Sequence, residues 1–234
     1  MTSRPYVLLS CAASIDGYID DTTESHLLLS NDADFDRVDE VRAGCDAILV
    51  GATTIRKDNP RLLVRSQVRQ DARTARGNSP TPVKVTITGH GDLDPAAKFF
   101  AAGDTGKIVY AASPALDKTR ERVGAVASVA DAGDPADLHR VLDDLHARGI
   151  GRLMVEGGGT MHTQFLAAGL ADELHLVIAP FFVGDLRAPR FVSEGTFPWN
   201  PGHRARLAEV TQIEDVVLLR YALSDRYDGR GGAA

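Results

Sequence analysis

The chain has 234 residues, of which 44% are hydrophobic and 25% are charged. This length fits one large domain or two small ones, and the composition is that of a globular protein with enough apolar residues for a core. The 26 basic and 32 acidic residues give a net charge of −6, which argues against a nucleic-acid-binding protein. Because the sequence contains neither a run of about 18 apolar residues nor a signal peptide, we expect a cytoplasmic protein without a membrane span.

The two cysteines, Cys11 and Cys45, both lie in apolar runs. This placement is typical of buried free thiols, so we expect neither a disulfide nor a metal site. A zinc-dependent nucleobase deaminase is also disfavoured, because no Pro-Cys-x-x-Cys follows a His-x-Glu.

Apolar runs of strand length alternate with segments of helical periodicity along most of the chain. Strands are predicted at residues 6–13, 47–50, 83–88, 107–110, 123–129, 152–155 and 174–178. Helices are predicted at 30–44 with Ser30 as the N-cap, just after 51–54, at 137–147 and at 160–168. The alternation predicts an α/β fold with a mostly parallel sheet.

Three segments depart from this alternation. Residues 66–80 are rich in Arg, Asp, Gly and Pro without periodicity, which predicts a solvated loop. Residues 204–211 and 216–221 follow one another without a helix, which predicts an antiparallel ribbon at the sheet edge. Residues 225–234 are expected to form a frayed tail.

The strongest functional motif is Leu153–Thr160, in which a strand leads through three glycines into a helix. Glycines let a ligand approach the backbone, and the N–H groups and positive end of a helix attract phosphate, so a dinucleotide pyrophosphate fits here. A glycine-rich turn needed only for tight packing is the alternative. The spacing is not Gly-x-Gly-x-x-Gly, so the Rossmann fingerprint does not apply.

A second turn, Gly51–Thr54, also follows a buried strand, so two strand ends can face one crevice. Thr54 and Asp58 are four residues apart and share one helical face. Arg61 and Arg65 follow at the same spacing and could grip a phosphate, although a solvated basic loop explains them as well.

A third motif, Ser10–Gly17, is a strand that breaks at Asp-Gly. Its small residues would let a flat ring lie against the backbone, but an ordinary strand end has the same composition. The motif is weak by itself.

Taken in order, Ala13-Ser-Ile-Asp-Gly17, the stretch Val41–Arg65, Val155-Glu-Gly-Gly-Gly-Thr160, Leu170-Ala-Asp-Glu-Leu and Ile178-Ala-Pro resemble the riboflavin-pathway pyrimidine reductase family. This family is the reductase half of the bifunctional RibD/RibG proteins. The resemblance implies a single dihydrofolate-reductase-like reductase domain over 1–224, with a mostly parallel central sheet flanked by helices and a C-terminal antiparallel ribbon, followed by a flexible tail at 225–234. It also implies a homodimer that uses NADPH.

In such enzymes the ribosyl group of a 5-amino-6-(5-phosphoribosylamino)pyrimidine, in its uracil or 2-amino form, is reduced to a ribityl chain. Hydride adds to the sugar C1′ after the ribose ring opens. Positioning of the reactants is expected to supply most of the acceleration.

The resemblance assigns roles to particular residues. Cofactor contacts are implied for Ala12, Thr54, Asp58, Thr88, Gly157, Gly158, Gly159 and Thr160. Substrate contacts are implied for Arg42, Leu62, Arg65 and Glu156, with the arginines on the phosphate and Glu156 on the amino edge of the pyrimidine. Glu156 and Asp58 are the carboxylates expected at the reaction centre, and no single proton donor emerges.

Several positions depart from the family pattern. Tyr18 follows Asp-Gly where Lys or Arg is common, Asp39 stands where His is frequent, and Thr88-Gly89 replaces a strand-end Asp-Ser. These departures leave open a dihydrofolate or pterin reductase, a paralogue of specialised metabolism, a nucleotide-binding protein without catalysis, and NADH in place of NADPH.

Overall fold

The structure is a computed structural model that describes residues 4–23 and 27–230. The chain forms two compact units, the first built mainly from Asp39–Met154 and the second from Tyr6–Val38 and the chain after Val155. Helix α1 (Asp32–Ala43) and strand β6 (Arg152–Gly157) each contribute residues to both units. Each unit contains its own set of strands.

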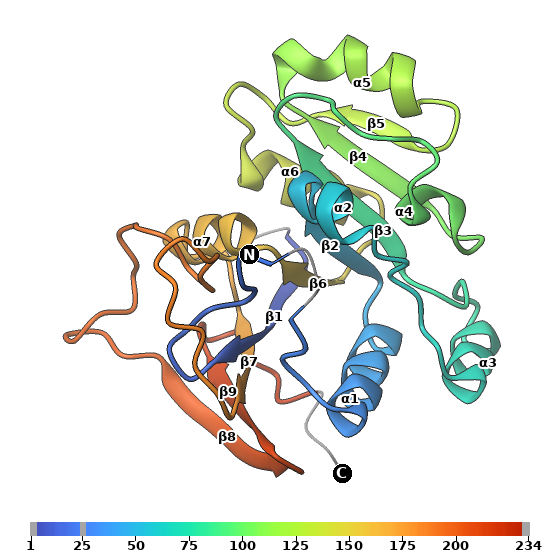
Figure 1. Ribbon diagram of the computed structural model, residues 1–234. Helices are drawn as coiled ribbons and strands as arrows, with labels where there is room; N and C mark the ends of the chain where they lie inside the picture. Colours follow the sequence, from blue (N-terminus) through green and yellow to red (C-terminus); the bar gives the residue numbers. More distant parts are fainter. Residues whose placement is uncertain (1–3, 24–26, 231–234) are drawn as a thin grey trace. The chain divides into compact units, whose positions relative to one another are not determined.

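The first unit is built on parallel strands in the order β5-β4-β3-β2 (Figure 1). The strands are β2 (Ala47–Gly51), β3 (Val83–Thr88), β4 (Lys107–Ala111) and β5 (Ser128–Asp131). The helical segments are α2 (Ala52–Asp58), α3 (Gln67–Ala75), α4 (Lys98–Ala101), η1 (Ser113–Ala115), α5 (Leu116–Val123) and α6 (Leu138–Ala147). Because the strands are parallel, the loops that follow β2 and β3 begin at the same edge.

Helix α6 forms as its periodicity predicts. Its apolar residues at helical spacing are all buried, and they are Leu138, Val141, Leu142 and Leu145. The side chain of Asp137 accepts a hydrogen bond from His139 N and caps the helix.

The expected solvated loop at 66–80 is wrong, because residues 67–75 form helix α3. The helix has no apolar stripe, and its buried residue is Arg73. The Arg73 guanidinium donates to the carbonyl oxygens of Ala43, Cys45 and Ser79 at 2.7–2.9 Å. The helix is therefore held by the polar contacts of Arg73. It lacks the hydrophobic face by which sequence periodicity identifies a helix.

Two further boundaries differ from the prediction. The strand expected at 123–129 is the end of α5, a turn and the first residues of β5, which begins at Ser128. Helix α1 begins at Asp32, and Asn31 rather than Ser30 caps it, because Asn31 Oδ1 accepts from Asp34 N at 3.0 Å.

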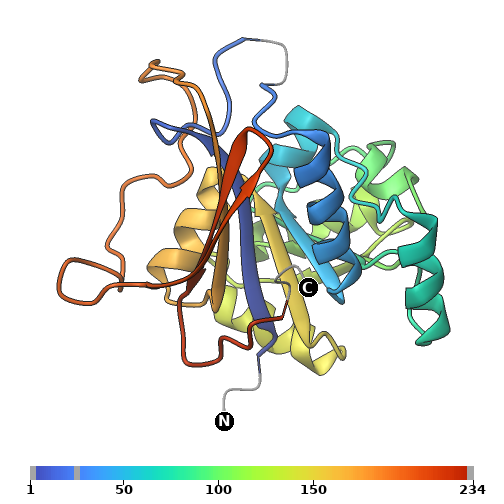
Figure 2. The same cartoon turned by 90° about the horizontal axis from the view of Figure 1, so that it is seen from below.

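The second unit contains strands in the order β1-β7-β9-β8, with β1 parallel to β7 and the other pairs antiparallel. The elements are β1 (Tyr6–Ser14), α7 (Gly159–Ala167), β7 (Glu173–Ala179), β8 (Arg206–Ile213) and β9 (Val216–Ala222). The predicted antiparallel ribbon is thus confirmed. Figure 2 shows β8 and β9 beside β7, and a long orange connection of irregular chain between β7 and β8.

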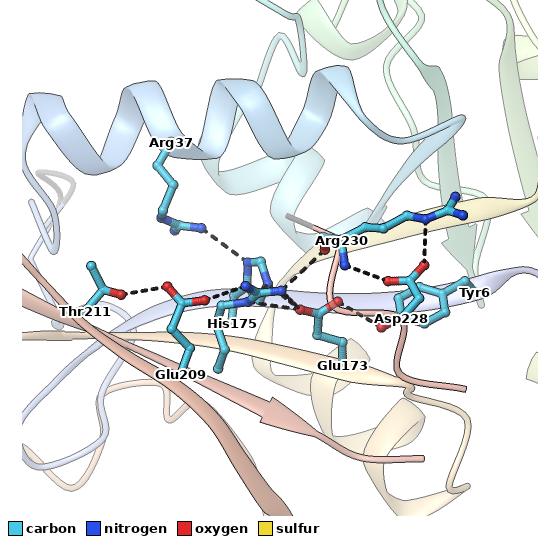
Figure 3. Close-up of polar contacts among 9 residues, drawn as sticks. Tyr6, Arg37, Glu173, His175, Glu209, Thr211, Asp228 and Arg230 are labelled. Atoms are coloured by element: carbon cyan, nitrogen blue, oxygen red, sulfur yellow. Dashed lines mark hydrogen bonds and ion pairs between the residues drawn. The ribbon is translucent and has the colours of Figure 1, made fainter. Parts of the chain in front are cut away.

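A row of ionisable groups, most of them buried, links the strands of this unit. The register places His175 opposite Arg220, and Arg220 opposite Glu209. Arg220 Nη2 donates to Glu173 Oε1 at 2.6 Å, and Nη1 contacts Glu209 Oε2 at 2.5 Å. Tyr6 Oη donates to the other oxygen of Glu173 at 2.9 Å (Figure 3). Glu173 therefore has partners on both carboxylate oxygens, as a buried ion requires.

The described part of the expected tail makes contacts with the strands. Arg226 lies 3.2 Å from the buried carboxylate of Asp172, and the Arg206 guanidinium lies 5.1 Å from the centre of the Tyr227 ring. Residues 231–234, also assigned to the tail, lie outside the described residues.

Three general features concern the described part of the chain. No helix there is both long and apolar enough to cross a membrane. No group of three or more His, Cys, Asp or Glu residues there could hold a metal ion. Neither Cys11 nor Cys45 forms a disulfide in the described part of the chain, and burial raises the pKa of Cys11 to about 12.

Candidate active site

The residues assigned to the site fall into two groups, one in each unit. The first unit contains Arg42, Thr54, Asp58, Leu62, Arg65 and Thr88. The second contains Ala12, Glu156, Gly157, Gly158, Gly159 and Thr160.

In the first unit, Thr54 and Asp58 lie on helix α2, as their spacing predicts. Thr54 is half-buried and Asp58 is exposed at the last turn. Asn59 ends the helix in the left-handed conformation (φ 44°), and its side chain accepts from Lys98 N at 2.6 Å. Leu62 also has a positive φ of 49°, and its side chain is buried. Such backbone conformations persist only where surrounding contacts hold them.

Asp39 supplies much of that support. Its buried carboxylate accepts from Arg65 N at 2.5 Å, from Ser66 N at 3.1 Å and from Arg69 Nη1 at 3.1 Å. Arg42 Nη1 donates to the carbonyl of Leu63 at 3.2 Å. The departure at Asp39 therefore has a structural role, which is to fix the loop that carries Leu62 and Arg65.

Arg42, on helix α1, contacts the loop that carries Leu62 and Arg65, so these three residues lie near one another. Their contact with a substrate stays a prediction. The side chain of Arg65 is 60% exposed, and its Nε lies 3.8 Å from Asp39 Oδ1. Arg65 thus presents its guanidinium at the surface while its backbone is held in place.

Thr88 ends strand β3 and is buried. Its hydroxyl accepts from Gly91 N at 3.0 Å and from His90 N at 3.4 Å. The side chain therefore orders the turn after β3, and a cofactor contact at this position stays a prediction.

In the second unit, β6 runs through Glu156 into the glycine turn that opens α7, as predicted. Gly157 has a φ of +137°, which side-chain-bearing residues rarely adopt. Gly158 is the N-cap and offers no capping side chain. The N–H groups of Gly159 and Thr160 donate to no residue among those described, so the turn keeps two open donors at the positive end of the helix.

The segment around Arg190 packs directly on this turn. A Cβ on Gly159 would lie 2.4 Å from the carbonyl oxygen of Arg190, which explains why glycine stands there. The hydroxyl of Thr163 donates to Gly159 O at 2.7 Å and accepts from Ser193 N at 2.9 Å. The loop after β7 and the first turn of α7 therefore form one connected structure.

The loop after β1 is also tightly closed. Ala12 is half-buried in β1 opposite Val177, and the following Ser14 accepts from Tyr18 N at 3.0 Å. Tyr18 is buried, with its hydroxyl accepting from Arg190 Nη2 at 2.8 Å. The second departure from the family pattern thus contacts the Arg190 segment.

Two residues that the sequence analysis did not single out lie against the turn. Besides Arg190, His162 lies in the first turns of α7, and its Nε2 is 3.8 Å from the position of a Cβ on Gly157. His162 Nδ1 is buried and has no hydrogen-bond partner among the described residues. Neither residue belongs to a motif, and only the spacing of His162 from the glycines could have drawn attention to it.

The model of the RibD C-terminal domain family matches residues 5–219. The chain belongs to the RibD C-terminal domain family. A relative from Methanothermobacter thermautotrophicus, named 2,5-diamino-6-ribosylamino-4(3H)-pyrimidinone 5′-phosphate reductase, is 40% identical and aligns over 94% of this chain and 99% of its own.

Two solved structures share the fold of this chain. RibD from Acinetobacter baumannii is 26% identical with a TM-score of 0.77, covering 94% of this chain and 58% of that one. A dihydrofolate reductase from Enterococcus faecalis, solved with NADP(H) and RAB-propyl, has a TM-score of 0.51 at 12% identity, covering 95% and 97%. The RibD family membership and the dihydrofolate-reductase-like α/β fold expected from the sequence are therefore confirmed.

For this RibD-family domain, the reductase relatives imply an oxidoreductase with a nicotinamide cofactor. The glycine turn fits such a group, because its two open N–H donors and the absence of side chains from 157 to 159 admit a phosphate close to the backbone.

Proposed function

We propose that this domain catalyses the NADPH-dependent reduction of the ribosyl group of a 2,5-diamino-6-(5-phosphoribosylamino)pyrimidinone to a ribityl chain. The observation that carries the proposal is the 40% identity to the Methanothermobacter reductase over nearly the whole of both chains. The name of that relative specifies the 2-amino compound as its substrate, which favours that form over the uracil form. A homodimer and a cytoplasmic location stay predictions.

The cofactor would be held by backbone and small polar groups. When bound, NADPH supplies the hydride that C1′ of the substrate accepts. Gly157, Gly158, Gly159 and Thr160 would bind its pyrophosphate through the open N–H groups, and Ala12 would lie against a flat ring. Contacts are also proposed for Thr54, Asp58 and Thr88.

The substrate would be held by the loop that Asp39 fixes. Arg42 and Arg65 would take the 5′-phosphate, since guanidinium groups bind phosphate with paired, charge-assisted hydrogen bonds. Leu62 would give an apolar contact. Glu156 would accept hydrogen bonds from the amino edge of the pyrimidine.

The chemistry needs little from the protein beyond position and one proton. Opening of the ribose ring gives an imine, and the imine nitrogen gains a proton as C1′ gains the hydride. Glu156 and Asp58 are the carboxylates proposed to act at this stage. The fixed backbone at Leu62 and Arg65 would keep the substrate oriented, which is the main source of acceleration in such a reaction.

The direct test measures loss of NADPH absorbance with the 2-amino pyrimidine, its uracil counterpart and dihydrofolate. We expect turnover of the 2-amino compound, slower turnover of the uracil form and none of dihydrofolate. Turnover of dihydrofolate alone would make the domain a pterin reductase. Binding of NADPH without oxidation by any of the three would make it a nucleotide-binding protein.

The proposed roles predict that two variants behave differently. Glu156→Gln should lower kcat about 10- to 100-fold, because one charge-assisted contact to the substrate is weakened, and should leave the Kd for NADPH unchanged. Gly158→Val should abolish cofactor binding. Identical behaviour of the two variants in turnover and in a fluorescence titration with NADPH would contradict the assignment.

A further inference from the structure

Arg190 differs from Arg187 of the same loop in having no carboxylate partner among the described residues. Its guanidinium lies 4.4 Å from the centre of the Tyr18 ring and donates to the Tyr18 hydroxyl at 2.8 Å. Within residues 4–23 and 27–230 no Asp or Glu forms an ion pair with it. Arg187, three residues earlier, is instead paired with Asp185 through two hydrogen bonds of 2.8 and 3.1 Å.

Asp185 and Asp16, on the two loops that meet at Arg190, already have hydrogen-bond partners. Asp185 also accepts from the Thr22 hydroxyl at 3.0 Å. Asp16 accepts from the Ser14 hydroxyl and from the N–H groups of Val183 and Gly184 at 2.6–3.1 Å. The positive charge of Arg190 is therefore not neutralised by the loop that carries it.

The Arg190 side chain is nevertheless held in place. The guanidinium lies on the ring of Tyr18, which is 2% exposed, so the packing around Tyr18 restricts the movement of this ring. The backbones are tied on both sides, because Ile19 N donates to Pro189 O at 2.9 Å and Phe191 N donates to Gly17 O at 3.0 Å. Binding an anion normally costs the entropy of ordering a flexible arginine side chain. Because the exposed Arg190 side chain is already held on Tyr18, this cost is smaller here.

Arg190 is fixed beside the glycine turn. Its carbonyl oxygen packs on Gly159, whose N–H and that of Thr160 donate to no described residue. His162, 1% exposed, faces the turn with Nε2 and has no hydrogen-bond partner at Nδ1. Burial lowers the pKa of His162 to about 4, so the ring is uncharged at neutral pH. His162 is thus a buried side chain beside the turn with an unsatisfied polar atom, which is an observation independent of the open N–H groups.

We propose that Arg190 is a phosphate-binding residue of this site, which presents a guanidinium fixed on Tyr18 to a phosphate group of the ligand bound at the glycine turn. The inference rests on the proposed function for the identity of the ligand. Its phosphate can come from the cofactor, as pyrophosphate or 2′-phosphate, or from the substrate 5′-phosphate. Tyr18 acts as a positioning residue.

The test compares Arg190→Gln with the matched control Arg187→Gln from the same loop. Kd values for NADPH and NADH come from fluorescence titration, and KM values from the phosphorylated pyrimidine and its dephosphorylated counterpart. We expect Arg190→Gln to weaken at least one phosphate-bearing ligand about 10- to 100-fold, and Arg187→Gln to change none by more than about twofold. Thermal melts of both variants should match the wild type, since both side chains are exposed.

The pattern of losses identifies the phosphate. A loss for NADPH but not NADH assigns the 2′-phosphate, equal losses for both assign the pyrophosphate, and a raised KM only for the phosphorylated pyrimidine assigns the 5′-phosphate. Tyr18→Phe, which keeps the ring and removes the hydroxyl, should give a smaller loss of the same pattern. Arg190→Lys should restore only part of the binding, because an ammonium lacks the paired donors.

Equal behaviour of Arg190→Gln and Arg187→Gln with every ligand would overturn the inference. If the wild type oxidises NADPH with the pyrimidine and Arg190 proves irrelevant, the inference fails and the proposed function stands. If the wild type shows no turnover but binds NADPH in an Arg190-dependent way, the proposed function fails and the phosphate site stands. A wild type that binds none of these ligands would overturn both.

Discussion

The two ends of strand β7 differ in whether the charged groups near them have partners. At the amino end, Glu173 and His175 are fully buried, and each is hydrogen-bonded to neighbouring charged groups. Beyond the carboxyl end, Arg190 has no carboxylate partner in the described residues, and the N–H groups of Gly159 and Thr160 are open.

This difference distinguishes the groups that stabilise the fold from the groups that are available to bind a ligand. Satisfied buried ions stabilise one arrangement of strands, while open donors held in a fixed position are available to a bound group. Four predictions test this separation.

The largest expected effect is the loss of stability at low pH, when the buried carboxylate of Glu173 at the amino end of β7 is protonated. Burial by itself raises the pKa of Glu173, but hydrogen bonds from His175 and Arg220 outweigh it and lower the pKa from its ordinary 4.5 to about 2. A carboxyl with a depressed pKa in the folded state stabilises the fold fully above its unfolded pKa. The contribution of about 3 kcal/mol is therefore lost as the pH falls from about 4.5 toward about 2.

Urea unfolding at a series of pH values measures this loss. Glu173→Gln removes the titrating group, so the variant should be less stable near neutral pH and should lose less stability in acid. If the free energy of unfolding depends on pH in the same way in the wild type and in the variant, Glu173 does not control unfolding in acid.

The second effect concerns a satisfied ion in the first unit. Asp39→Ala leaves Arg65 N and Ser66 N without their acceptor and Arg69 without its buried partner. We expect a loss of about 2 kcal/mol in the free energy of unfolding, measured by denaturant titration, and a raised KM for the phosphorylated pyrimidine. Glu40→Ala is the control, because Glu40 is 73% exposed and lies 3.9 Å from Arg69. Equal losses for the two variants would count against a supporting role for Asp39.

The same contrast explains which parts of the molecule the sequence predicts. Strand β6, the glycine turn and α7 were predicted within two residues, because a buried apolar strand, a glycine run and a helix are all local signals. Helix α3 was missed because its anchor, Arg73, binds carbonyls of Ala43 and Cys45 about thirty residues earlier. Hydrophobic periodicity carries no trace of such a contact.

The candidate site divides in the same way. The glycine turn and the shared helical face of Thr54 and Asp58 follow from the sequence pattern, whereas the roles proposed for them rest on the family resemblance. Arg190 was not, because an arginine in an irregular loop has no meaning until Tyr18, 172 residues earlier, lies beneath it. Asp39 drew attention only as a departure, and its three hydrogen bonds become visible only in the folded chain.

The third prediction targets the packing of the glycine turn. Gly159→Ala would place a Cβ 2.4 Å from Arg190 O, so either the turn or the loop must shift. We expect a loss of about 1 to 2 kcal/mol in stability and weaker NADPH binding, measured by thermal melts and fluorescence titration. Gly106→Ala serves as the control, since its Cβ would meet only Val83 at an ordinary 3.6 Å. An unchanged Kd for NADPH in Gly159→Ala would show that the turn does not contact the cofactor.

The smallest effect isolates the link between the turn and its loop. Thr163→Val keeps the shape of the side chain but removes the hydroxyl that joins Gly159 O to Ser193 N. Because Thr163 is half-buried and water can replace part of the lost hydrogen bonds, we expect a loss of only about 1 kcal/mol in stability. If the loop is held chiefly by Tyr18 and the Gly17 contact, phosphate-dependent binding through Arg190 should survive this substitution. A loss of NADPH affinity as large as that of Arg190→Gln would instead show that Thr163 is what keeps Arg190 in place, and would move the positioning role from Tyr18 to the helix.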